Sequence, residues 1–252
     1  MLELGRAHDH LQADGLRLVE AAGRSPGAPV PSCPEWDAAA LVVHTSAVHH
    51  WAAGILRHRA TDRPARDVPE AVTADWVAAD AWYREGLALV AGALADTDPD
   101  TPVWNFVDGV PAPAAFWSRR MAQETSVHRV DAELAAWAAG AGPPPGPIDH
   151  ELAADGIEEC ARMVDARLRH RARPGFTGSL GLAATDGPWE WTLALAPDHL
   201  GVRPGSAGAL DVVRAPVSTL RLWLVHRPDP AVAPPVVDGP GTVAGRWADV
   251  AL

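Results

Sequence analysis

The chain has 252 residues, which suits one large domain or two modest ones, and 48% of them are hydrophobic, enough to build a buried core. Its 32 acidic residues outnumber the 21 basic ones and give a net charge of −11, which argues against general affinity for nucleic acid or anionic membranes. No apolar run reaches the roughly 20 residues of a membrane span, and the N-terminus lacks a signal-peptide pattern, so we expect a soluble cytoplasmic protein.

The first half of the chain is predicted to form helices separated by turn-rich loops. Gly23 follows the first apolar pattern, Asp37 stands at the N-cap position of the second, and Pro113 suits the first turn of the fourth. Residues 25–34 are too proline-rich for a helix or a central strand. The predicted helices span Leu2–Ala22, Asp37–Arg59, Val72–Leu94 and Pro113–Ala139. Four helices of this length predict an antiparallel bundle.

The segment from Gly140 to Pro147 is the clearest linker, and the character of the chain changes after it. One more helix is followed by segments with the alternation of strands. The predicted elements are helices at Glu151–Arg171 and Val217–His226 and strands at Phe176–Ala183, Trp189–Ala196, Ala209–Val213 and Pro235–Val237. The sequence therefore predicts an α+β protein, with a helical bundle over residues 1–147 and a smaller α/β domain over 148–252.

The two cysteines, Cys33 and Cys160, lie far apart and form no Cys-x-x-Cys motif. This spacing argues against a disulfide framework and against a structural zinc knuckle. If a thiol takes part in catalysis, we expect it to arrive with a cosubstrate.

A carboxylate and an imidazole lie one turn apart on the fourth predicted helix. Glu124 and His128 are four positions apart, so their side chains share one face of the helix. Such a pair can hold a divalent cation, but Glu and His at this spacing more often form a solvated pair on a helix surface. A third ligand from another helix would favour the metal, because two histidines and one carboxylate with open positions are typical of a catalytic metal centre.

The second predicted helix contains three histidines, at positions 44, 49 and 50. His44 follows an apolar triplet and belongs to a stripe at helical spacing, whose other members are Leu41, Val48, Trp51 and Ile55. At about 100° per residue, His49 and His50 fall outside that stripe. We expect His44 to point into the bundle, and His49 and His50 to be partly exposed.

Separated segments of the chain resemble the mycothiol-dependent maleylpyruvate isomerase family, which belongs to the DinB-like metal-binding bundles. The first comprises Cys33-Pro-Glu-Trp-Asp, Leu41-Val-Val-His44 and Val48-His-His-Trp51. The second, from Arg120 to Glu133, is similar to the family's Glu-Thr-x-x-His-Arg-x-Asp-Ala-Glu stretch. The third runs from Leu152 to Glu159, and the segment Leu220-Arg-Leu-Trp-Leu-Val-His-Arg227 is similar to the family's C-terminal domain.

The resemblance implies a DinB-like four-helix bundle with a small C-terminal α/β domain, and a His–Glu–His metal site usually taken as zinc. The implied ligands are His44, Glu124 and His128, and Arg227 stands where the C-terminal domain could reach the substrate. Mycothiol is the implied cosubstrate, its sulfur activated by the metal for attack on an electrophilic carbon. With maleylpyruvate, thiol addition, bond rotation and thiol loss give fumarylpyruvate; a paralogue would transfer the thiol to another electrophile.

Residues around the implied ligands have structural explanations as well. Surface salt bridges explain Arg120 and Arg129 better than binding of a diacid substrate. Asp131 and Glu133 are candidates to orient the histidines from behind. We expect most tryptophans, Trp36 included, in the core.

Two alternative functions stay open on the sequence alone. A non-catalytic bundle that senses a ligand or binds a partner would hold a metal without thiol-dependent turnover. A metal-dependent hydrolase would need a general base near the metal, and the chain has no His-Glu-x-x-His motif. As partners we expect a small electrophile and a low-molecular-weight thiol, and as assembly a monomer or homodimer.

Overall fold

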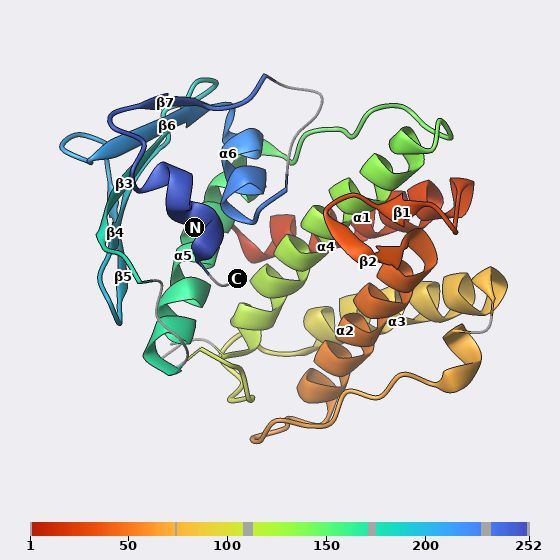
Figure 1. Cartoon of the computed structure of the whole chain (residues 1–252). Helices are drawn as coiled ribbons and strands as arrows, with labels where there is room; N and C mark the ends of the chain where they lie inside the picture. The colour runs from red at the N-terminus through yellow and green to blue at the C-terminus, as the bar shows by residue number, and fades with distance from the viewer. Residues whose placement is uncertain (1, 74, 108–112, 171–174, 228–232, 251–252) are drawn as a thin grey trace. The chain divides into compact units, whose positions relative to one another are not determined.

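A computed structural model describes residues 2–73, 75–107, 113–170, 175–227 and 233–250. The chain divides into two compact units, Met1–Ile148 and Asp149–Leu252 (Figure 1). The first unit is built of helices and the second carries a sheet, which confirms the predicted α+β class. Within the described ranges, no helix has both the length and the apolar character needed to cross a membrane.

Four long helices build the first unit, and they pack mainly as two pairs. The helices are α1 (Leu4–Arg24), α2 (Ala38–Arg57), α3 (Trp76–Asp96) and α4 (Pro113–Ala138). α1 packs mainly against α4, and α2 packs mainly against α3. The predicted ends are close to the observed ones except at α3, which begins at Trp76 and not at Val72. Asp75 caps α3 by accepting from the backbone N–H of Ala78, and a short 3-10 helix, η1 (Glu70–Thr73), precedes it.

The proline-rich segment before α2 forms a small antiparallel hairpin, which the sequence did not predict. Its strands are β1 (Pro29–Val30) and β2 (Cys33–Asp37), and Val30 pairs with Cys33. Prolines are tolerated here because both strands are edges. Asp37, at the end of β2, caps α2 through the N–H of Ala40, as expected. The hairpin leads directly into α2 and packs against both α2 and α4.

The segment that follows α4 is tied back to the bundle by Arg129. This side chain is only 1% exposed, so its expected position at the surface is wrong, although it does form ion pairs. Its guanidinium donates to Glu133 and to the carbonyl oxygens of Gly146 and Pro147, and its Nε lies 3.3 Å from Asp14 Oδ1. Glu133 is engaged by this network. The expectation that it orients the histidines is therefore wrong.

The second unit combines a five-stranded sheet with two helices. The sheet order is β5-β4-β3-β6-β7, with β3 and β6 parallel and the other neighbours antiparallel. The elements are α5 (His150–His170), β3 (Gly178–Ala184), β4 (Glu190–Leu195), β5 (Leu200–Pro204), β6 (Asp211–Ala215), α6 (Val217–Leu224), β7 (Val236–Asp238) and the 3-10 helix η2 (Ala244–Asp249). β5 and η2 were not predicted, and Arg171, the predicted end of α5, lies outside the described residues.

A buried carboxylate at the start of β6 holds the segment after β7. Asp211 is fully buried and accepts hydrogen bonds from the backbone N–H groups of Gly241, Val243 and Ala244 at 2.7, 2.7 and 3.0 Å. Burial by itself would raise the pKa of Asp211, but these three donors favour the charged form and lower it below its ordinary value.

Candidate metal centre

The three implied ligands lie together in the first unit, at the meeting of α2 and α4. Glu124 Oε1 lies 3.7 Å from His44 Nε2 and 3.4 Å from His128 Nε2. One ligand atom from each of the three residues lies within 4.8 Å of the other two. Within the ranges that the structure describes, this is the one group of three or more His, Cys, Asp or Glu side chains arranged in this way.

The donor set and its spacing fit one divalent cation. Zinc binds imidazole nitrogen and carboxylate oxygen at about 2.0–2.2 Å, so two ligand atoms of a tetrahedral site lie about 3.4 Å apart. The two nitrogen-to-oxygen distances in the protein are 3.7 and 3.4 Å. Two histidines and one carboxylate would also leave positions for an exogenous ligand. The residues present therefore suit the metal that the sequence resemblance implies.

His128 is oriented from behind by Asp131. The Nδ1–H of His128 donates to Asp131 Oδ2 at 2.9 Å, so Nε2 is the nitrogen that faces Glu124 and that would bind a metal after losing its proton. Asp131 is fully buried and also accepts from the hydroxyl of Ser32, at the tip of the β1–β2 hairpin, at 2.5 Å. Burial alone would lower the pKa of His128, but the hydrogen bonds to Asp131 and Glu124 outweigh it and raise the pKa to about 9.

The carboxylate of Glu124 has a different partner on each oxygen. Oε1 faces the two histidines, whereas Oε2 forms an ion pair with Arg120, one turn earlier on α4. Burial would raise the pKa of Glu124, but Arg120 and the two histidines lower it well below its ordinary value. Glu124 is thus held as an anion although its side chain is largely shielded from bulk water. Arg120 thus forms an ion pair, as expected, but the pair is largely shielded and its partner is a candidate ligand.

An aromatic side chain from the hairpin covers part of the site. The ring of Trp36 lies 4.5 Å from that of His44 and 6.3 Å from that of His128, measured between centroids. The expectation that Trp36 belongs to the core is wrong: the side chain is half-buried and lies beside the candidate ligands. The side chain of His44 is 26% exposed and that of His128 only 8%, so the site is accessible from the His44 side.

The other two histidines of α2 have structural partners. His49 was expected to be partly exposed, but it is fully buried and its Nε2 lies 2.9 Å from the hydroxyl of Thr125. The helical-stripe argument failed because His49 contacts both Tyr83 of α3 and Thr125 of α4. His50 is half-buried, as expected, and donates to the carbonyl oxygen of Trp82 at 3.2 Å.

Arg227, the implied substrate-binding arginine, belongs to the second unit. Its Nη1 donates to the carbonyl oxygen of Val225 at 2.8 Å within that unit. Its catalytic role stays a prediction.

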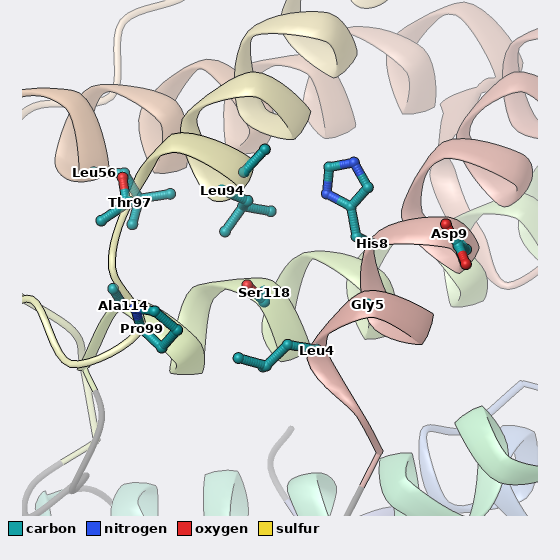
Figure 2. Close-up of a pocket in the computed structure, with 11 residues that line it drawn as sticks. Leu4, Gly5, His8, Asp9, Leu56, Leu94, Thr97, Pro99, Ala114 and Ser118 are labelled. Carbon is teal, nitrogen blue, oxygen red and sulfur yellow. The ribbon is translucent and has the colours of Figure 1, made fainter.

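A cavity of about 370 Å³ lies in the first unit and is lined by none of the three candidate ligands. Figure 2 shows His8 of α1, Leu94 at the end of α3 and Ser118 of α4 around one hollow. Its walls are mainly apolar, formed by residues such as Leu4, Leu56, Pro99 and Ala114.

The sequence and the fold are similar to those of known proteins. Residues 8–133 match the family model of the mycothiol maleylpyruvate isomerase N-terminal domain. A crystal structure of the mycothiol-dependent maleylpyruvate isomerase has a TM-score of 0.63 at 14% identity, and one of its histidine-to-alanine mutant has 0.61 at 13%. Both comparisons cover 94% of this chain and 93% of the other, so the likeness of fold spans both units. Among curated proteins, no relative matches the sequence.

Proposed function

This chain belongs to the family of the mycothiol maleylpyruvate isomerase N-terminal domain, and we propose that it is a metal- and mycothiol-dependent enzyme acting on an electrophilic small molecule. The reaction is either cis–trans isomerisation of the maleylpyruvate type or transfer of the thiol to its substrate. The metal is most simply zinc, held by His44, Glu124 and His128.

One observation carries the proposal: two imidazole nitrogens and one carboxylate oxygen from two different helices converge, with the site accessible on the His44 side. A chance surface pair on α4 would not be met by a histidine from α2. A divalent cation held there would lower the pKa of a bound thiol and present its sulfur as a thiolate at neutral pH.

The remaining residues of the site prepare this chemistry. Asp131, itself held by the hydroxyl of Ser32, fixes the ring of His128 so that its Nε2 faces Glu124. Trp36 supplies an apolar surface beside the ring of His44, against which the carbon chain of a substrate would pack. Of the two protein thiols, Cys160 is buried and Cys33 is half-buried, which favours a thiol supplied by a cosubstrate.

The test is turnover of metal-reconstituted protein with maleylpyruvate and with a generic epoxide, each with and without mycothiol. We expect about one metal per chain, and product only when the thiol is present. His44→Ala should lose both the metal and the activity, whereas His50→Ala on the same helix should keep both.

Two results would contradict the proposal. Metal binding without any thiol-dependent product would indicate the ligand-sensing alternative, and turnover that needs no thiol would indicate hydrolysis. A cytoplasmic location and a monomeric or homodimeric state stay predictions.

A further inference from the structure

The two oxygens of the Glu124 carboxylate are divided between different partners. Oε1 faces His44 Nε2 at 3.7 Å and His128 Nε2 at 3.4 Å, and Oε2 pairs with the Nη2 of Arg120. Arg120 precedes Glu124 by four positions on α4, so the two side chains share one helical face. The side chain of Arg120 is 19% exposed and that of Glu124 14%, so solvent screens the attraction between them less than it would in a surface pair.

This division limits how Glu124 can bind a cation. A carboxylate can ligate through one oxygen or through both, and the second mode occupies an additional coordination position. A guanidinium presents its donors in a rigid planar fork, which holds a carboxylate oxygen in a fixed direction. While Arg120 engages Oε2, only Oε1 is directed toward the two histidine nitrogens.

We infer that Arg120 is a positioning residue that keeps Glu124 a one-oxygen ligand and thereby reserves a coordination position for the thiol. The inference rests on the proposed metal site and specifies how that site stays open. Arg120 also lowers the affinity of the site for the metal, because its positive charge repels the cation that the site must hold.

Loss of the guanidinium should therefore change two properties in opposite directions. Without Arg120, Oε2 is released to join Oε1, and the repulsion of the cation disappears, so the metal binds more tightly. The additional oxygen fills the position that the thiol would use, so the thiol binds more weakly. A residue that only supports the fold would weaken both together.

The experiment compares Arg120→Met with the wild type and with Arg119→Met, which removes one positive charge from the neighbouring position about 100° around the same helix. Metal affinity is measured by competition for Zn²⁺ with a chromophoric chelator. Coordination is read from the visible absorption of the Co²⁺-loaded protein, which weakens as the coordination number rises. Thiol binding is read from the change of that absorption on titration with mycothiol.

We expect Arg120→Met to bind Zn²⁺ about tenfold more tightly than the wild type, as loss of a partly screened repulsion predicts. Its Co²⁺ absorption should be weaker, and its mycothiol affinity should be at least about tenfold lower. Arg119→Met should match the wild type in all three measurements. Arg120→Lys, which can still pair with Oε2, should lie between the wild type and Arg120→Met.

Weaker or unchanged Zn²⁺ binding by Arg120→Met, with unchanged Co²⁺ absorption, would overturn the role of Arg120 while the metal site stands. Absence of metal binding by the wild type would instead overturn the proposed function, so the two failures are distinct. If Arg120→Met does not fold, as judged by its circular dichroism, Arg120→Lys decides the question by the same three readouts.

Discussion

Replacement of Arg129 by Met should destabilise the first unit by about 3 kcal/mol, because it leaves two shielded carboxylates without their main partner. Arg129 is 1% exposed, and the side chains of Asp14 and Glu133 are only 9% and 13% exposed. Removal of one partner from a buried ion pair typically costs about 3–5 kcal/mol. The carbonyl oxygens of Gly146 and Pro147 lose donors as well, at about 1 kcal/mol each.

Arg17 offsets part of that loss, which places the expected value at the lower end of the range. Its Nη2 lies 2.8 Å from Glu133 Oε1 and its Nη1 lies 3.7 Å from Asp14 Oδ1, so both carboxylates keep one cation nearby. The side chain of Arg17 is 47% exposed, however, and a solvent-screened partner of this kind contributes at most about 1 kcal/mol.

The assay is urea unfolding followed by tryptophan fluorescence, with the free energy of unfolding extrapolated to water. The matched control is Arg84→Met, which breaks the exposed ion pair between Arg84 and Asp80 and should cost less than about 1 kcal/mol. If Arg129→Met were no more destabilising than Arg84→Met, the buried network would not be what holds the segment after α4 to the bundle.

Three further outcomes are expected. Asp131→Ala should lower Zn²⁺ affinity about 10- to 100-fold in chelator competition, because His128 loses the acceptor that orients it; an unchanged affinity would remove Asp131 from the site. The double variant Cys33→Ser/Cys160→Ser should keep its mycothiol-dependent turnover, and loss of turnover in a folded variant would identify a protein thiol as the nucleophile. Asp211→Asn should be less stable than the wild type near neutral pH, and the difference should shrink in acid. Since folding lowers the pKa of Asp211, its stabilisation is complete above the ordinary value of 3.8 and is lost as the pH falls through the folded value. Urea midpoints measured from about pH 3 to pH 7 would show this, and a constant difference would contradict it.

The helices and the candidate ligands could be predicted because their signals are local. Apolar spacing located the four helices, and Asp37 caps α2 at the predicted position. The pairing of Glu124 with His128 follows from a spacing of four residues on a helix. The assignment of His44 to the same site came from the family resemblance, and the geometry brings its Nε2 to 3.7 Å from Glu124 Oε1.

Asp131 was expected behind His128 from their spacing, but the other contacts around the ligands could not be predicted because they depend on packing. Ser32 and Trp36 reach the site through a hairpin whose strands are too short and too rich in proline to give a strand signal. His49 is buried because α2 has neighbours on more than one side, whereas a helical wheel assumes a single buried stripe. Arg129 has the sequence context of a surface residue, and only the return of the chain at Gly146 and Pro147 encloses it.

The pairing of helices has a consequence for how such a site can diversify. His44 belongs to the α2–α3 pair, and Glu124 and His128 belong to the α1–α4 pair. The distance from His44 to the other two ligands therefore depends on how the two helix pairs pack against each other. A substitution that enlarges or trims a side chain between the pairs would shift one pair against the other. Such substitutions can thus adjust which cation fits, and how much room remains beside it, while the three ligands themselves stay unchanged.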